Sequence, residues 1–180
     1  MKSIKLLFLL SLTFLTQSFS QMQQFIEVQP NAITEVTGDL SEGAIMKDIS
    51  WAWSSQNACF PETRVDRFTG SHVLYSCDLP KYTEYEITVI PEDENANFSI
   101  YAYEVGQVDE SNTVPNLSRC IRCEADFKWA YKRRGKTQDH TRTVKDILAI
   151  NNPYQVVIGV VGAEGLTSGA YTLRITAKSR

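Results

Sequence analysis

The clearest alternation of apolar and polar positions lies near the C-terminal end of the chain. Two runs each place their apolar side chains on one face: Tyr154, Val156, Ile158 and Val160 in the first, and Tyr171, Leu173 and Ile175 in the second. A period of two is typical of a half-buried β-strand. The glycine-containing segment 162–169 between the runs predicts a turn, so Tyr154–Thr176 is expected to form a β-hairpin that upstream strands cover.

A second pair of alternating runs precedes this one. Residues 85–89 and 98–103 alternate in the same way, and the acidic segment 91–97 between them begins with a proline. This pattern predicts a second hairpin.

The remaining segments carry weaker patterns. We expect a strand at 71–77, a first strand near 25–28, a turn at 37–43 and a loop-like stretch over most of 54–70. Residues 44–53 fit a strand buried on both faces, with a helix as the alternative, and 144–150 fit a bulged strand better than a helical turn. Phe127, Trp129 and Tyr131 share one face of a further predicted strand.

Eight to ten antiparallel strands without a long amphipathic helix predict an all-β chain. We expect a single β-sandwich or jelly-roll-like domain over residues 21–180, with 104–142 as a cysteine-bearing insertion. A chain of this length can bury one core, so one domain is the simplest organisation.

Residues 1–20 have the composition of a signal peptide. Lys2 and Lys5 precede an apolar stretch, and Ser18 and Ser20 offer small side chains at a cleavage site. The apolar stretch is short for a membrane span, so the mature protein is expected to be secreted or periplasmic and to start at Gln21. Its removal takes away two lysines and no acid, which changes the formal charge from −3 to −5. Such a mild acidic balance excludes general attraction to nucleic acid. We expect a monomer.

Four cysteines are an even number in a chain expected to be exported, which predicts disulfides. We favour the pairs Cys59–Cys77 and Cys120–Cys123 among the three connectivities. Closing a loop of about 18 residues is worth about 3 kcal/mol in the chain-entropy model.

Several segments resemble the bacterial pre-peptidase C-terminal domain: Thr37–Leu40, Tyr85–Pro91, Asn97–Tyr103, Asn152–Val160 and Ser168–Ile175. The resemblance covers most of residues 37–176. It implies a jelly-roll-like sandwich of the kind appended to exported enzymes, some relatives of which bind polymers such as collagen or chitin. This chain departs from the family in having a longer region at 104–142 and no catalytic domain beside it.

No catalytic residue is predicted. Nucleophilic hydrolysis needs a base beside a Ser or Cys, and His72 and His140 stand without a recognisable nucleophile motif. The Cys120-x-x-Cys123 spacing occurs in redox and zinc sites, but no second pair or histidine completes a metal shell, which favours a structural disulfide. We therefore expect a protein that is not an enzyme and that has no cofactor and no metal. The one metal candidate is calcium at Glu92, Asp93 and Glu94, and the alternative is that these residues form a solvated turn.

Two features could hold a polymer. The basic cluster Lys132, Arg133, Arg134 and Lys136 follows Trp129 and Tyr131, a combination suited to anionic groups and sugar rings, although a solvated turn explains the same charges. Trp51 and Trp53 could form a flat platform for a polysaccharide, although their alternation with Ile45 and Ile49 favours burial.

The sequence thus predicts a non-catalytic exported binding or accessory module that engages an unidentified protein or polysaccharide. A carbohydrate-binding module with exposed aromatic side chains is the alternative, and a small secreted hydrolase is the third hypothesis.

Overall fold

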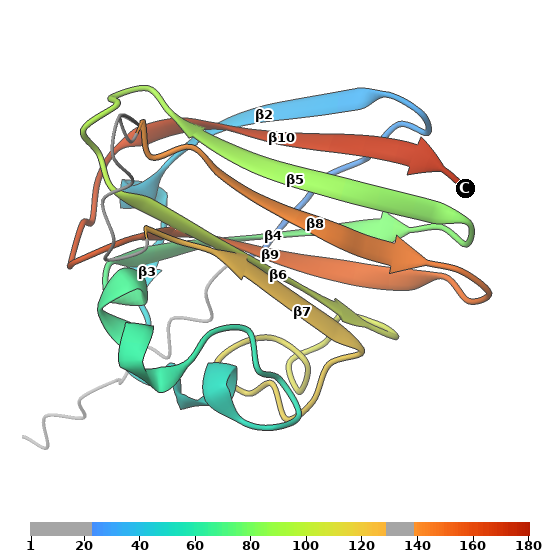
Figure 1. Cartoon of the computed structure of the whole chain (residues 1–180), viewed down its shortest axis with the longest axis horizontal. Helices are drawn as coiled ribbons and strands as arrows, with labels where there is room; N and C mark the ends of the chain where they lie inside the picture. Colours follow the sequence, from blue (N-terminus) through green and yellow to red (C-terminus); the bar gives the residue numbers. More distant parts are fainter. Residues whose placement is uncertain (1–22, 129–138) are drawn as a thin grey trace, which may run out of the picture.

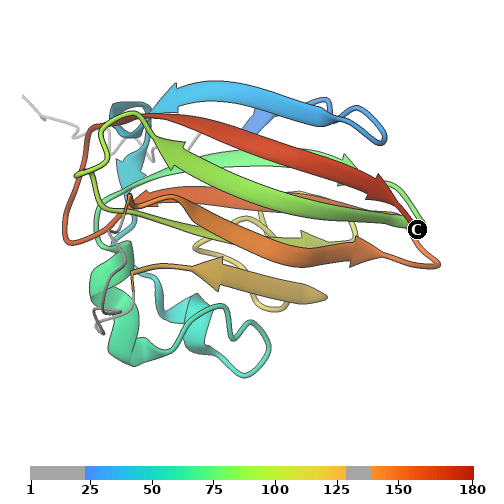
Figure 2. The ribbon, with the colours of Figure 1, turned by 45° about the horizontal axis from the view of Figure 1, so that its top comes forward.

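The computed structural model describes residues 23–128 and 139–180. In these ranges ten strands form two sheets that pack face to face as a β-sandwich, which confirms the predicted all-β fold class (Figures 1 and 2). The six-stranded sheet has the order β1-β4-β9-β6-β7, with β3 also paired to β4. The four-stranded sheet has the order β2-β10-β5-β8.

The six-stranded sheet contains the long strands β4 (Ser71–Leu79), β6 (Phe98–Val105) and β9 (Tyr154–Gly162). Shorter strands complete it: β1 (Gln24–Phe25), β3 (Ala44–Ile45) and β7 (Arg122–Asp126). The pairing of β1 with β4 is parallel, whereas the other pairs are antiparallel.

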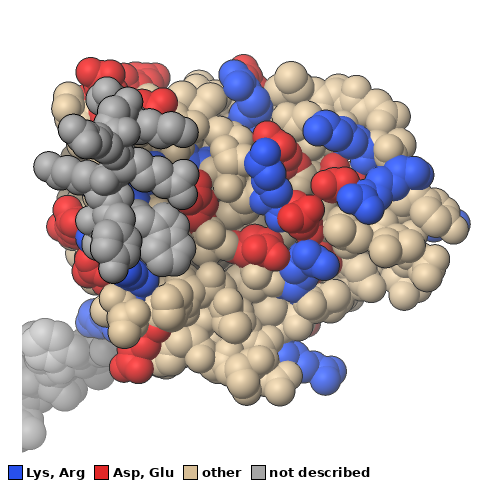
Figure 3. All heavy atoms as spheres, viewed as in Figure 1, with Lys and Arg blue, Asp and Glu red and all other residues tan. Residues whose placement is uncertain are grey.

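The four-stranded sheet consists of β2 (Ile33–Asp39), β5 (Thr83–Pro91), β8 (Arg142–Ala149) and β10 (Ala170–Ser179). Its outer face is polar, with cross-strand contacts between Glu35 and Arg174 and between Thr88 and Thr143. Figure 3 shows acidic and basic side chains interspersed over β10, β5 and β8. Exposed pairs of this kind contribute little to stability, so the fold depends on the buried face.

Both predicted hairpins are wrong. Strands β5 and β6 lie in different sheets, and so do β9 and β10, because the turns between them cross from one sheet to the other. The two strands of each predicted hairpin therefore face one another across the core and do not share a ladder. The alternation of apolar and polar residues indicates which side of a strand is buried. That side faces the core whether the two strands pair in one sheet or lie in two facing sheets, so the pattern does not distinguish these arrangements.

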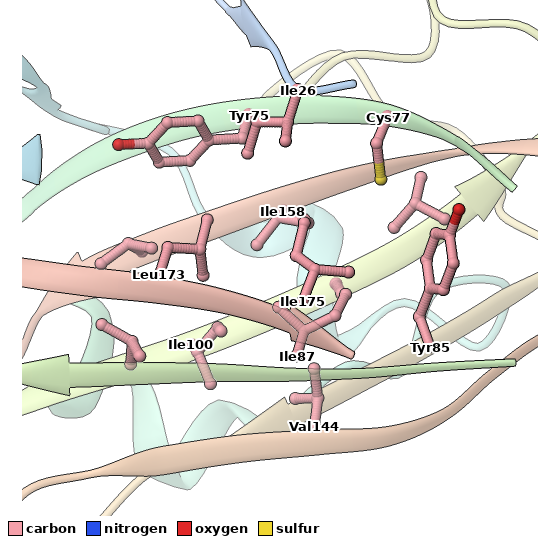
Figure 4. Packing of buried hydrophobic residues seen from close by; sticks show 14 of the residues in the cluster. Ile26, Tyr75, Cys77, Tyr85, Ile87, Ile100, Val144, Ile158, Leu173 and Ile175 are labelled. Carbon is pink, nitrogen blue, oxygen red and sulfur yellow. The ribbon is translucent and has the colours of Figure 1, made fainter. Parts of the chain in front are cut away.

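The core between the sheets is formed mainly by the inward positions of six strands, β4, β5, β6, β8, β9 and β10, with Val36 of β2 packed against it. Figure 4 shows side chains from both sheets meeting there, among them Tyr75, Ile158, Ile87 and Ile175. The hydroxyls of Tyr75 and Tyr171 bond to each other at 2.9 Å, which satisfies both polar groups inside the sandwich.

A second core lies on the other face of the six-stranded sheet, under a cover layer that we define as residues 46–70 and 106–121. The cover layer contains the 3₁₀ helices η2 (Ser50–Trp53) and η3 (Glu62–Phe68), while η1 (Leu40–Glu42) follows β2. Aromatic rings dominate this second core: Trp51, Phe60, Phe68, Tyr101, Tyr103 and Phe127. The ring planes of Phe60 and Phe68 stack with centroids 3.7 Å apart.

The predicted strand at 44–53 is wrong except for its first two residues, because the rest belongs to the cover layer. Trp51 is only 6% exposed, so its predicted burial is confirmed although it comes from a 3₁₀ helix. The predicted turn at 37–43 is wrong at its start, since β2 continues to Asp39. The bulged strand near 144–150 is confirmed: its register against β5 shifts, and Asp146 takes a φ of 61°.

Candidate functional site

The six residues predicted to bind a polymer, Trp129, Tyr131, Lys132, Arg133, Arg134 and Lys136, lie outside the described residues. The structure does describe both flanks of their segment. Phe127 is buried with its ring centroid 5.6 Å from that of Phe68. On the other flank, Arg142 is buried and its Nε donates to the Phe98 carbonyl at 3.0 Å. The connection from β7 to β8 is thus fixed at both ends.

His140 lies at one of these flanks and contacts a guanidinium. Its Nδ1 lies 3.1 Å from an Nη of Arg142, which can only donate, so this nitrogen accepts. Burial first, then the charges of Arg142 and Lys128, lower the pKa of His140. The ring is therefore neutral and is held by a structural contact.

His72 is fully buried under the cover layer. Its Nε2 lies 2.9 Å from the Phe68 carbonyl, which must accept, so Nε2 carries the proton. The Tyr101 hydroxyl then donates to Nδ1 over 3.3 Å. Burial lowers the pKa of His72 to about 4. These hydrogen bonds join the two imidazoles to the Phe68 carbonyl, the Tyr101 hydroxyl and the Arg142 guanidinium, and they are structural contacts.

The predicted cysteine pairing is wrong. The structure joins Cys59 of the cover layer to Cys123 of β7, with Cα atoms 5.0 Å apart, and leaves Cys77 and Cys120 as thiols. Cys77 points into the core between the sheets, whereas Cys59 lies on the opposite side of the six-stranded sheet, so the two cannot pair. Burial raises the pKa of Cys77 to about 12 and that of Cys120 to about 11, which disfavours both thiolates at neutral pH.

A small cavity of about 150 Å³ lies beside this disulfide, between residues 55–58 and 120–123. Asn57, 3% exposed, forms part of its wall and donates through Nδ2 to the Leu117 carbonyl. Its Oδ1 has no hydrogen-bond partner among the described residues. A cavity of this size and polarity suits ordered water or one small polar group.

In the acidic turn at 91–97, the Asp93 carboxylate accepts hydrogen bonds from a nearby residue of the same turn. The Oδ1 of Asp93 accepts from the backbone N–H and side-chain amide of Asn95, at 2.9 and 3.0 Å, and these bonds lower the pKa of Asp93. Within 23–128 and 139–180, no group of three or more His, Cys, Asp or Glu side chains could hold a metal ion. The structure therefore gives no support for calcium at Glu92, Asp93 and Glu94.

The tryptophan platform is not present. Trp51 is buried, with its ring centroid 5.2 Å from that of Tyr101, and Trp53 is half-buried beside Phe60. These two rings hold the cover layer on the sheet, and they do not form a flat exposed surface.

The structure identifies an exposed apolar pair that the sequence reading missed, at the end of the sandwich where the chain terminates (Figures 1 and 2). Tyr82 in the β4–β5 turn is 50% exposed, and Ile150 in the β8–β9 turn is 55% exposed. The Tyr82 N–H donates to the Ile150 carbonyl at 3.2 Å, and its own carbonyl accepts from the Arg180 N–H at 2.8 Å. We call this pair of residues and their turns, 80–82 and 150–153, the tip surface.

Tyr82 is held in the left-handed region, with a φ of 59°. A bulky side chain is uncommon there, and Gly or Asn would relieve the strain. The Pro80-Lys81 dipeptide does signal a turn, but no sequence pattern shows that the next residue takes a positive φ with its ring outside.

No helix in the described part of the chain is long and apolar enough to cross a membrane.

No protein-family profile and no curated protein matches the sequence. Solved structures show distant similarity, each at 12% identity. One is the pre-peptidase C-terminal domain of collagenase from Bacillus anthracis, with a TM-score of 0.40 over 86% of this chain and 96% of the domain. Another is PliG from Aeromonas hydrophila, a periplasmic inhibitor of g-type lysozyme, with a TM-score of 0.37 over 86% and 96%. The third is CorA, a surface-associated copper-binding protein of Methylomicrobium album BG8, with a TM-score of 0.42 over 88% and 98%. At these TM-scores the similarities carry no inference about ligand or activity.

Proposed function

We propose that this protein is a non-catalytic exported binding module and that the tip surface contacts its partner, an extended polymer. The observation that carries the proposal is the conformation of Tyr82. A backbone strained at φ 59° and fixed by hydrogen bonds on both sides presents a half-exposed aromatic ring, with Lys81 Nζ 5.7 Å from the ring centroid. The bond to the Ile150 carbonyl places an exposed isoleucine in the adjacent turn. Strain of this kind clusters at functional sites, and rigid aromatic side chains are common anchors of binding surfaces.

The chemistry of the described residues supports binding over catalysis. His72 and His140 are neutral and hydrogen-bonded inside the fold, and both thiols have raised pKa values. The disulfide between Cys59 and Cys123 supports export, because such bonds persist in oxidising compartments.

The test uses two polymers as probes, insoluble chitin and fibrillar collagen, in a co-sedimentation assay. The variant Tyr82→Asn keeps a residue that tolerates a positive φ and removes the ring, and Ile150→Ser removes the neighbouring apolar side chain. The matched control is Ile45→Ser, which removes an equally exposed isoleucine (56%) from β3. We expect wild type and control to bind one of the polymers and the Tyr82→Asn/Ile150→Ser protein to lose most of that binding. Absence of binding to both polymers, or equal binding by all three proteins, contradicts the proposal.

A further inference from the structure

The two edge strands of the four-stranded sheet, β8 and β2, differ in whether their outward backbone groups are hydrogen-bonded. Along β8 the outward N–H of Thr143 donates to the Asp126 carboxylate at 2.8 Å, and that of Leu148 donates to Glu104 at 2.8 Å. The bulge at Asp146 disturbs the same edge. Carboxylates from the other sheet thus occupy the positions where a further strand would bond.

The edge formed by β2 is open. Hydrogen bonds from Leu40 N to Gly169 O and from Ala177 N to Ala32 O place the backbone groups of the even-numbered residues toward β10. The N–H and C=O groups of the odd-numbered residues therefore point away from the sheet: Ile33, Glu35, Thr37 and Asp39. Within the described ranges, no residue bonds to these four N–H groups.

This edge carries two carboxylates, Glu35 and Asp39, but lacks several other features that block pairing. Over seven residues β2 has no proline, no lysine and no bulge, and Ile33 at its start is 62% exposed. The edge strands of the six-stranded sheet are shorter: β1 and β3 have two residues each, and β7 has five.

We propose that β2 pairs antiparallel with β2 of a second copy of this chain, centred on Val36. In an antiparallel ladder, residues whose N–H and C=O groups point out of one edge must lie opposite residues of the same kind on the other copy. Three registers meet this condition while keeping most of the two β2 strands paired. Centring on Glu35 sets this carboxylate against itself, and centring on Thr37 sets it against Asp39. Centring on Val36 places Glu35 opposite Thr37 and Ile33 opposite Asp39, so that all four outward residues pair and no like charges meet.

The same register brings Val36 of the two copies together on the face that packs toward the core. The two four-stranded sheets then join into one continuous sheet. This dimer is independent of the tip surface, and it differs from the monomer expected from the sequence.

The test is sedimentation equilibrium of the mature protein from about 1 µM to about 1 mM, a range that brackets weak and moderate dimers. Thr37→Glu places a carboxylate opposite Glu35 in both symmetric pairs, whereas Thr37→Lys places an ammonium there. We expect the dimer dissociation constant to rise roughly threefold or more for Thr37→Glu and to fall by a similar factor for Thr37→Lys. The matched controls are Thr172→Glu and Thr172→Lys, which carry the same charges on the neighbouring strand β10, away from the edge. Repeating the series with Cys120→Ser removes dimers linked through that thiol.

Amide hydrogen exchange of the wild type locates the interface. Exchange at Ile33, Glu35, Thr37 and Asp39 is expected to slow as the protein concentration rises. A monomer over the whole range, equal effects of glutamate and lysine at position 37, or protection elsewhere without protection at β2 overturns the proposal.

Discussion

The ring of Tyr101 on β6 lies directly over Gly159, its partner on β9, so closely that a Cβ on Gly159 would clash with it. Because the ring can cross β9 at this glycine, its hydroxyl reaches His72 on β4. One side chain thereby connects three strands and satisfies a buried imidazole.

Replacing Gly159 with alanine is expected to displace Tyr101 and break its bond to His72. We expect the free energy of unfolding to fall by about 2–3 kcal/mol, as for overpacked cores. Urea denaturation measures the loss. Gly106→Ala is the matched control, since a Cβ there meets no atom within 4 Å. A loss at Gly159 no larger than at Gly106 would contradict the close approach.

His72 should make the fold sensitive to acid. Its folded pKa of about 4 lies below the ordinary 6.5, so the stability that depends on the neutral ring is complete above about pH 6.5 and is lost as pH falls through about 4. In His72→Gln the amide can still donate to the Phe68 carbonyl but does not titrate. Between pH 7 and pH 4, wild type is expected to lose about 3 kcal/mol more than this variant. Parallel pH profiles for the two proteins would be inconsistent with a buried neutral His72.

Glu104 should make the stability of the fold change with pH in the opposite direction from His72. It is 1% exposed, and burial raises its pKa above the usual 4.5 despite the bond from Leu148. A raised carboxyl pKa means that stability falls as pH rises through that value. Glu104→Gln is therefore expected to be more stable than wild type near pH 7.5, with the advantage disappearing below about pH 4.5.

The control for loss of one negative charge is Glu92→Gln on an exposed turn. Denaturant unfolding at both pH values decides the matter. If Glu104→Gln is less stable than wild type at neutral pH, the ionised carboxylate is the stabilising form.

The disulfide should stabilise the attachment of the cover layer. A crosslink over 64 residues is worth about 4 kcal/mol in the chain-entropy model, so Cys59→Ala/Cys123→Ala should lower the free energy of unfolding by about that amount. Cys120→Ser is the control, because its hydroxyl can replace the contact to the Gln56 carbonyl. Peptide mapping without reduction should yield a Cys59–Cys123 fragment. A Cys59–Cys77 fragment would instead restore the pairing expected from the sequence.

The basic segment gives a prediction that depends on sequence alone. We propose that, if the protein also binds an anionic polymer, Lys132, Arg133, Arg134 and Lys136 are the contact. Retention on immobilised heparin should then fall with salt, because the attraction is screened over about 8–10 Å at physiological ionic strength. The quadruple alanine variant should elute earlier than wild type. Equal elution of the two proteins, or no retention at low salt, would leave the segment as a solvated turn.

Much of the strand content could be read from alternation, but the assignment of strands to sheets could not. The runs at 71–77, 85–89 and 98–103 and both C-terminal runs are strands, because a period of two requires one buried face. The alternation pattern does not depend on which sheet a strand joins. Both predicted hairpins failed for that reason.

The second core, under the cover layer, could not be predicted from the sequence either. Trp51 alternates with Ile49 as it would in a strand, yet it comes from a short 3₁₀ helix whose position depends on contacts with Tyr101 and Phe60. The Cys59–Cys123 bond follows from the same long-range packing, which spacing along the chain does not encode. The tip surface was missed because a positive φ at Tyr82 has no pattern in the residues around it.

The position of β10 has a consequence for how the chain can fold. The last strand lies between β2 and β5, and β2, which begins at Ile33, pairs with no other described strand. The four-stranded sheet therefore cannot close until residues 170–179 are available, and pairing over such a separation is slow. A chain truncated before Ala170 would leave β2 without a neighbour and expose part of the inner face of the six-stranded sheet, so late arrival or loss of residues 170–179 puts the nascent protein at risk of aggregation.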